Sequence, residues 1–159
     1  MTPIRYLTGD DTDPQAAGPK IIAPCRNDLG RWGRGFVLAL SDRWAEPAAD
    51  YRTWAKLGTA GGFDLGAVRF VEVRADIHVA NMIGQHGIKK GSSGPPIRYD
   101  DIGAALAAVG DRALELGATV HMPRIECGLA GGKWELVEPL ILAALSGRGV
   151  AVTVYDFGG

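Results

Sequence analysis

Short apolar stretches alternate with stretches of helical spacing along most of the chain, and this alternation restricts the possible folds more than any other feature. The stretches that indicate strands are residues 4–7, 20–24, 67–73, 77–83, 119–122 and 150–155. The stretches that indicate helices are residues 36–44, 47–57, 99–116 and 134–145. Strands that alternate with helices form a largely parallel sheet with helices on both faces. We therefore expect an α/β fold with three layers, α/β/α, around a central mixed, mostly parallel sheet.

One local signal refines this expectation, and the continuity of the chain sets its domain organisation. Residues 67–73 and 77–83 are separated only by a short turn, which predicts a hairpin and hence one antiparallel pair. Gly117 follows the longest helical stretch and is typical of a helix end. Because no internal repeat or linker is present, we expect residues 1–159 to form a single domain.

The charge balance and the cysteine pattern exclude several classes of protein. The chain has 17 basic and 18 acidic residues, so no global basic field would draw it onto nucleic acid. No apolar run approaches the roughly 20 residues of a membrane span, and the start of the chain lacks the pattern of a secretion signal. Cys25 and Cys127 form no CxxC pair, so no metal site is expected. We expect a cytoplasmic monomer without a metal, a cofactor or a membrane partner.

Three glycine-rich segments, residues 27–35, 84–94 and 128–132, each follow a predicted strand. Ligands of such sheets bind beyond the carboxyl ends of the strands, and glycine lets backbone amides approach a ligand closely. Amides at helix N-termini bind phosphate without lysine or arginine, so residues 33–35 and 131–132 could hold a pyrophosphate between them. The GxGxxG and GxxxxGK(S/T) motifs are both absent, which disfavours a Rossmann dehydrogenase and a P-loop enzyme.

The segment from Met122 to Trp134, MPRIECGLAGGKW, resembles the MPRIGCGLxxxxW segment of macrodomains. Shorter similarities to the same family occur, in the family's order, at residues 8–10, 25–37, 96–99 and 153–155. The resemblance is strongest to the subfamily of the terminal ADP-ribose protein glycohydrolase and the chromatin-remodeller macrodomain. It implies a macrodomain fold and a cleft that binds ADP-ribose, either free or attached to a protein or a nucleic acid.

The resemblance also implies which residues contact the ligand. Asp10 would accept a hydrogen bond from the adenine amino group, with Tyr155 on the same side. Residues 33–36 would contact the diphosphate, Asn27 would lie near the distal ribose, and residues 127–129 would close the other side with backbone amides. The implied ligand contacts are Asp10, Asp11, Asn27, Gly33, Arg34, Gly35, Phe36, Cys127, Gly128, Leu129, Ala130, Tyr155 and Phe157.

An ordinary structural role is the alternative for several of these residues. Asp10 can stabilise a turn through its own side chain. Tyr155 can be a core residue, and Cys127 a small packed one. The sequence leaves both interpretations open at each position.

The chain departs from the glycohydrolase subfamily at the two residues of its covalent mechanism. Where the subfamily has a lysine at a strand end and an aspartate after GCGL, this chain has Gln85 and Ala130. Glutamine cannot form a Schiff base, and alanine cannot assist proton transfer. We therefore expect the lysine-dependent mechanism to be absent.

Three hypotheses remain for the activity. The first, which we favour, is an ADP-ribosylhydrolase that removes ADP-ribose from a protein carboxylate or a nucleobase by positioning the substrate and a water. Its candidate catalytic residues are Gln85, His86, Asp28 and Glu126. The second is a reader that binds ADP-ribose or ADP-ribosylated targets without cleaving them. In the third, Lys89 or Lys90 replaces the missing lysine. A phosphatase would share the amide cradles, but the sequence has no carboxylate cluster for metal ions.

Overall fold

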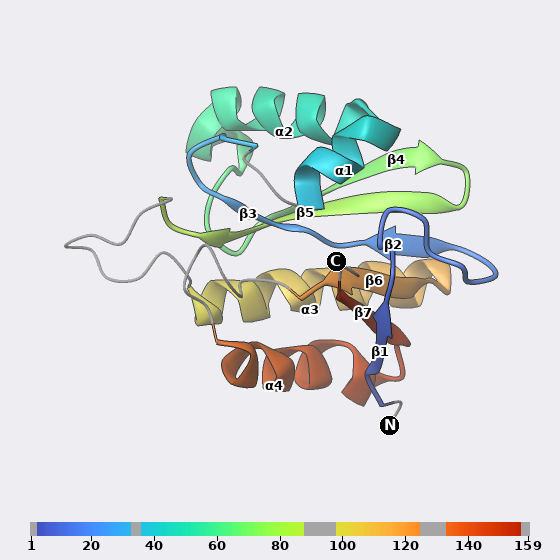
Figure 1. Cartoon of the computed structure of the whole chain (residues 1–159). Helices are drawn as coiled ribbons and strands as arrows, with labels where there is room; N and C mark the ends of the chain where they lie inside the picture. The colour runs from blue at the N-terminus through green and yellow to red at the C-terminus, as the bar shows by residue number, and fades with distance from the viewer. Residues whose placement is uncertain (1–2, 33–35, 88–97, 125–132, 157–159) are drawn as a thin grey trace.

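The computed structural model describes residues 3–32, 36–87, 98–124 and 133–156, which contain one sheet and helices on both of its sides (Figure 1). The strands are β1 (Arg5–Thr8), β2 (Lys20–Ile22), β3 (Cys25–Asn27), β4 (Val68–Arg74), β5 (Ile77–Gln85), β6 (Thr119–Pro123) and β7 (Val152–Asp156). The α-helices are α1 (Phe36–Arg43), α2 (Glu46–Leu57), α3 (Tyr99–Leu116) and α4 (Trp134–Ala144), and single 3-10 turns follow at Gly58–Gly61 and Ser146–Arg148. None of the described helices is both long and apolar enough to cross a membrane.

The strand β5 has neighbours along both of its sides. The strands β1, β7, β6, β2, β5 and β3 are joined by parallel pairs, and β4 pairs antiparallel with β5. Met82 pairs both with Cys25 of β3 and with Val68 of β4, so β3 and β4 lie on opposite sides of β5. The strands β2 and β3 follow one another along one side, interrupted at Pro24, which has no N–H to donate. The predicted mixed, mostly parallel sheet and its hairpin are confirmed.

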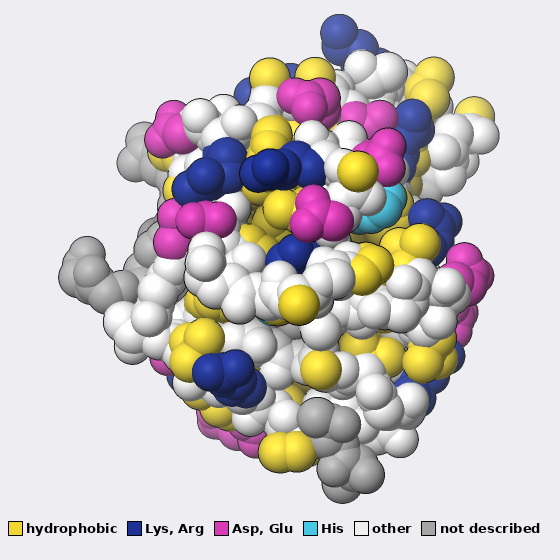
Figure 2. All heavy atoms as spheres, turned by 90° about the vertical axis from the view of Figure 1, so that its right-hand side faces the viewer, with side chains coloured by type: hydrophobic (Ala, Val, Ile, Leu, Met, Phe, Trp, Pro, Cys, Tyr) yellow, Lys and Arg dark blue, Asp and Glu magenta, His cyan; other side chains and the backbone are white. Residues whose placement is uncertain are grey.

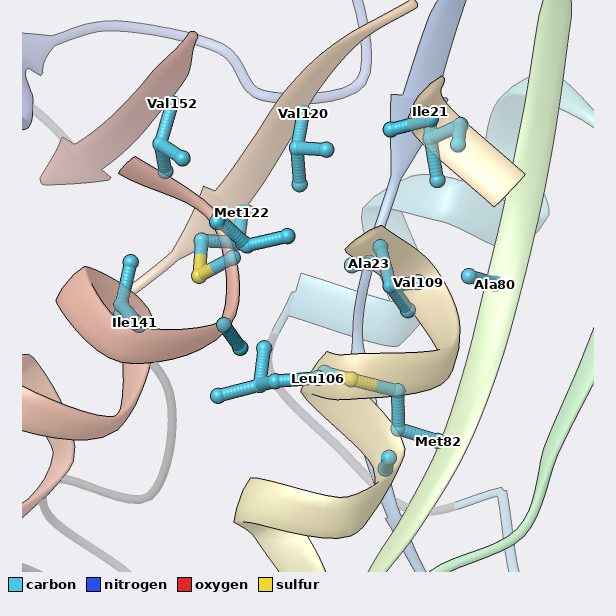
Figure 3. Close-up of a cluster of buried hydrophobic side chains, with 14 of the residues drawn as sticks. Ile21, Ala23, Ala80, Met82, Leu106, Val109, Val120, Met122, Ile141 and Val152 are labelled. Atoms are coloured by element: carbon cyan, nitrogen blue, oxygen red, sulfur yellow. The ribbon is translucent and has the colours of Figure 1, made fainter. Parts of the chain in front are cut away.

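Two clusters of buried side chains lie on opposite faces of the sheet. The helices α3 and α4 cover one face, where Val109 and Ile141 pack toward side chains of the strands (Figure 3). The helices α1 and α2 cover the other face, where Tyr51 packs in the second cluster. Ile21 belongs to the first cluster and its neighbour Ile22 to the second, as the alternation of a strand requires. This arrangement confirms the predicted α/β/α layers.

The observed elements differ from the predicted ones mainly at two strand ends. The sequence predicts glycine-rich loops at residues 27–35 and 84–94 and no separate strand at 25–27. In the structure, β3 includes Asn27 and β5 includes Gln85. These two residues pair with each other. The ladder therefore extends β5 beyond the apolar residues that indicated it and adds β3, because backbone pairing does not require apolar side chains.

Gly84 of β5 lies in close contact with two buried side chains. A Cβ atom at this position would lie 2.6 Å from Sγ of Cys25 and 2.6 Å from Cγ1 of Ile102. We expect Gly84→Ala to lower the free energy of unfolding by about 1–3 kcal/mol, as overpacking of a core does, in urea denaturation. Gly103→Ala on α3 is the control, because its Cβ would be 3.5 Å from its nearest neighbour and alanine favours a helix. Equal stability of Gly84→Ala and the parent protein would contradict this packing.

Candidate functional site

The carboxyl ends of β3 and β5 lie side by side, toward the left of Figure 1. Asn27 pairs with Gln85, and the backbone N–H of Asp28 donates to the carbonyl oxygen of Gln85 at 2.9 Å. Ligands of parallel sheets bind at this edge. The pairing therefore joins two segments that the sequence analysis had linked only through a shared predicted function.

Asp28 and His86 form a hydrogen-bonded pair directly beyond these strand ends. Nδ1 of His86 lies 2.6 Å from Oδ2 of Asp28, and Oδ1 of Asp28 accepts the backbone N–H of Gly87 at 2.8 Å. Because a carboxylate oxygen only accepts, Nδ1 of His86 is the donor of this bond, and Nε2 is the ring nitrogen that points away from Asp28. The Asp28 side chain is 17% exposed and that of His86 46%. This is the arrangement of a base whose orientation is set by a carboxylate.

The side chain of Gln85 stabilises the same turn. Its Nε2 donates to the carbonyl oxygen of Gly87 at 2.9 Å. The structure thus brings together three of the four predicted catalytic residues, Asp28, Gln85 and His86, at the adjacent ends of β3 and β5. Glu126, the fourth, lies outside the described residues, as do Lys89 and Lys90.

Asn27, a predicted ribose contact, is buried and uses its side chain to shape the segment that follows it. Its Oδ1 accepts the backbone N–H groups of Leu29 at 3.0 Å and Arg31 at 3.3 Å. Its Nδ2 donates to the carbonyl oxygen of Arg31 at 2.6 Å. These bonds close a compact loop around the amide. A direct contact between Asn27 and a ligand stays a prediction.

Asp10 stabilises the turn that follows β1. Its Oδ1 accepts the backbone N–H of Thr12 at 2.9 Å and the hydroxyl of Thr12 at 2.6 Å, and its Oδ2 lies 3.4 Å from Nη2 of Arg43. The Thr12 hydroxyl, together with Arg43, lowers the pKa of Asp10, which keeps the carboxylate ionised. The turn-stabilising interpretation of Asp10 is therefore observed. Its role toward adenine stays a prediction, and the half-exposed carboxylate has room for a further donor.

Asp10 and Tyr155 both line one pocket, whose volume is about 360 Å³. The residues that line it include Arg5 of β1, His121 of β6 and Thr153 of β7. These strands belong to the half of the sheet that α1 and α2 do not cover. The two residues predicted for the adenine side thus come together at a hollow large enough for part of a nucleotide.

His121, which has no predicted role, lines the same pocket and is bonded to Tyr155. Its Nδ1 lies 2.7 Å from the Tyr155 hydroxyl, and its Nε2 lies 2.7 Å from the Thr119 hydroxyl. Burial lowers the pKa of His121 to about 4 and raises that of Tyr155 to about 12, so both are neutral at pH 7. The alternation of residues 119–122 contained a signal for this residue, because His121 stands between Val120 and Met122, which face the other way into the core.

Arg124, a second residue without a predicted role, connects the ends of β6 and β7 with α4. Its Nε and Nη2 donate to the two carboxylate oxygens of Asp156 at 2.7 and 2.8 Å. Its guanidinium lies over the rings of Tyr6 and Trp134, at 5.3 and 4.9 Å from their centroids. Arg124 thereby ties the end of β6 to the start of α4.

The remaining predicted ligand contacts are only partly within the described residues. Phe36 begins α1 and packs against the second core cluster. The predicted contacts that lie outside the described residues are Gly33, Arg34, Gly35, Cys127, Gly128, Leu129, Ala130 and Phe157.

Within the described ranges, no three His, Cys, Asp or Glu side chains gather as ligands of a metal ion. The face on the right of Figure 1 carries basic and acidic side chains close together among the coloured residues (Figure 2).

Asp11 is fully buried, and neither of its carboxylate oxygens has a hydrogen-bond partner among the described residues. Burial, with a smaller contribution from Asp10, raises the pKa of Asp11 well above its usual range. A raised pKa favours the folded state below the usual pKa of aspartate and opposes it as the pH rises. The carboxylate therefore destabilises the fold at neutral pH. Its predicted contact with a ligand stays a prediction.

We expect Asp11→Asn to raise the free energy of unfolding at pH 7 by roughly 1–3 kcal/mol, because burying an unpaired charge costs more than burying an amide. The gain should shrink as the pH falls below about 4, where aspartate in the unfolded chain also takes up a proton. Thermal denaturation between pH 3 and pH 8 measures both effects. Asp13→Asn, at an exposed neighbouring position, should leave stability unchanged. A loss of stability in Asp11→Asn at pH 7 would show that the carboxylate has a stabilising partner.

Two solved structures are similar to this chain over nearly its whole length. A macrodomain protein from Streptomyces coelicolor is 56% identical, with a TM-score of 0.88, over 98% of this chain and 100% of that one. A protein of unknown function from Bacteroides thetaiotaomicron is 52% identical, with a TM-score of 0.94, over 98% of this chain and 99% of that one. A structure of Thermosipho africanus DarTG in complex with ADP-ribose has a TM-score of 0.68 over 85% of this chain and 37% of that one, and its 16% identity makes this a likeness of fold alone.

Curated sequences and family models complete the comparison. Chromodomain-helicase-DNA-binding protein 1-like of Mus musculus is 33% identical over 98% of this chain, and the Danio rerio protein of the same name is 32% identical over 98%. The chain spans only 18% and 16% of the lengths of these two proteins. No protein-family model matches the chain. Its fold, its motifs and its identity with the Streptomyces protein together show that this chain belongs to the macrodomain family.

Proposed function

We propose that this macrodomain is an ADP-ribosylhydrolase, which binds ADP-ribose along the carboxyl edge of its sheet and releases it from a protein carboxylate or a nucleobase. Membership of the family and the ADP-ribose complex of the Thermosipho neighbour support the choice of ligand. The pocket shared by Asp10 and Tyr155 supports the position of the adenine end. The single observation that carries the hydrolase assignment is the pair of Asp28 and His86, 2.6 Å apart at this edge.

In the proposed reaction, water attacks the anomeric carbon of the distal ribose. Nε2 of His86 takes a proton from the water while the new C–O bond forms, and the bond to the leaving group breaks. A carboxylate leaves as an anion, and the proton on His86 then passes to solvent, whereas a leaving nucleobase nitrogen takes up the proton that His86 has received. The carboxylate of Asp28 orients the ring and stabilises the imidazolium that forms.

Gln85 occupies the position of the subfamily's lysine, but the proposed reaction uses it differently. An amide cannot form a Schiff base with the sugar, so the reaction contains no covalent intermediate between enzyme and ribose. Its hydrogen bond to Gly87 instead closes the turn that presents His86. Gln85 is therefore a positioning residue in this proposal.

The second candidate function is that of a reader, which binds ADP-ribose or ADP-ribosylated targets without cleaving them. The glutamine at position 85 favours it, because the resembling subfamily performs its chemistry with a lysine there. The two functions differ in one measurement, the release of ADP-ribose from a modified substrate. A suitable panel contains a glutamate-linked protein and a base-modified DNA strand.

ADP-ribose should bind the protein in a calorimetric titration, and Asp10→Ala should weaken that binding by about 1–3 kcal/mol, the range for losing a hydrogen bond to a charged group. Ribose 5-phosphate lacks adenine, so its binding should hardly change in Asp10→Ala. Thr12→Val is the control, since it removes the hydroxyl that bonds to Asp10 while leaving the carboxylate in place. If ADP-ribose gives no heat at millimolar concentration, the proposed ligand is wrong. An equal loss for both ligands would show that Asp10 only supports the turn.

His86→Ala should lower the turnover of ADP-ribosylated protein by about 100-fold or more, as removal of a general base does, with ADP-ribose affinity nearly unchanged. Imidazole in solution should restore part of the activity, because the vacated position can admit the free base. His78→Ala is the matched control, since His78 lies near the other end of the same strand. Full activity of His86→Ala would show that His86 is not the general base. Glu126→Gln then tests the remaining candidate for that role.

A further inference from the structure

Tyr51 of α2 is fully buried and reaches the loop that carries Asp28. Its hydroxyl lies 2.6 Å from the backbone oxygen of Asn27 and 2.9 Å from Oδ1 of Asn27. Burial raises the pKa of Tyr51 to about 12, so the hydroxyl keeps its hydrogen and acts as a donor at every pH of interest. Asn27 therefore receives a buried donor on the residue that immediately precedes Asp28.

The ring of Tyr51 is held independently of its hydroxyl. The ring centroids of Trp32 and Phe63 lie 5.6 and 5.7 Å from that of Tyr51. The guanidinium of Arg26 lies 5.2 Å from the Trp32 ring and 5.8 Å from the Tyr51 ring, and it also donates to the carbonyl oxygen of Arg31 at 3.1 Å. Removal of the hydroxyl alone would leave this aromatic packing in place.

The loop after β3 depends on Asn27, because the Asn27 side chain makes the bonds that close the loop around Arg31. Asp28 is the first residue of this loop, and its carboxylate holds the ring of His86. The contacts form a continuous chain from Tyr51 through Asn27 and Asp28 to His86. A small displacement of a catalytic group reduces turnover strongly. This series of contacts therefore affects turnover through the position of Asp28.

We propose that Tyr51 is a positioning residue for the reaction, whose hydroxyl fixes Asn27 and thereby sets the position of Asp28 against His86. This inference rests on the proposed hydrolase function for its kinetic consequence. The geometric link from Tyr51 to His86 stands on the structure alone. In this scheme Tyr51 bonds to neither His86 nor the ligand and acts only through Asn27 and the loop.

The kinetic test is a double-mutant cycle on ADP-ribosylated protein. Tyr51→Phe alone should lower turnover by about tenfold. In the background of Asp28→Asn it should lower turnover by less than about twofold, because the group that Tyr51 positions is already lost. A merely structural role would give the same factor in both backgrounds, and that result, or an unchanged turnover in Tyr51→Phe, overturns the inference.

Trp54→Phe is the matched control. Trp54 lies on the same helix, is buried, and donates its indole N–H to the carbonyl oxygen of Gly61 at 2.9 Å, away from the loop. Its substitution should lower the melting temperature about as much as Tyr51→Phe does while leaving turnover unchanged. A drop in turnover equal to that of Tyr51→Phe would attribute both effects to general loosening and overturn the inference.

A spectroscopic arm separates the inference from the proposed function. In protein labelled with ¹⁵N-histidine, the ring signals of His86, assigned with His86→Ala, report whether the hydrogen stays on Nδ1. They should shift in Tyr51→Phe toward the pattern of Asp28→Asn and stay at the parent pattern in Trp54→Phe. If no substrate releases ADP-ribose but the shift occurs, the hydrolase function fails and the positioning link holds. An unshifted signal in Tyr51→Phe overturns the link whatever the activity.

Discussion

The pairing of β5 on both of its sides is the interaction on which the rest of this macrodomain depends. Val79 pairs with a residue of β2 and a residue of β4, and Met82 pairs with a residue of β3 and a residue of β4. Most residues of β5 are also buried on both faces. A strand in this position cannot shift its register without moving both helical layers. The end of β5 is therefore a rigid platform for the groups that follow it.

The candidate site gains its precision from this platform and from a few polar bonds beyond it. The backbone bond from Asp28 to Gln85 continues the ladder by one residue past the strand ends. The carboxylate of Asp28 then has both oxygens engaged, one by the ring of His86 and one by the N–H of Gly87. A carboxylate held at two points can orient an imidazole more firmly than one held by its own chain alone. The site thus combines a firmly held carboxylate, that of Asp28, with the partly exposed imidazole ring of His86.

The half of the sheet around β1, β7 and β6 is organised differently. There the surface opposite α3 and α4 carries His121 and Tyr155, which bond to each other, in place of an apolar cluster. Asp11 is buried nearby without a partner among the described residues. The pKa of Tyr155 is raised by burial, with a smaller contribution from Asp11. Burial of an ionised Asp11 without a partner among the described residues opposes folding.

Sequence periodicity determined the architecture because burial leaves a record in the order of residues. The apolar stretches located the helices and most strands, the short turn at residues 74–76 determined the hairpin, and Gly117 marked the end of α3 with its left-handed backbone. The motif at residues 122–134 indicated the family. The strand β3 escaped prediction because its pairing with β5 is a property of the backbone and leaves little trace in the side chains of Cys25–Asn27.

The residues of the site could be nominated from the sequence, but their relations could not. Asp28 and His86 were both candidates, yet nothing in their order shows that one orients the other, since the contact exists only once β3 lies beside β5. Asn27 was expected near the distal ribose, which stays a prediction, and the structure adds that its side chain bonds within its own loop and to Tyr51. The sequence by itself determined which elements form and which residue types stand at the strand ends. Only the tertiary structure decided which of them touch, because hydrogen bonds between distant segments depend on positions in space that no local pattern encodes.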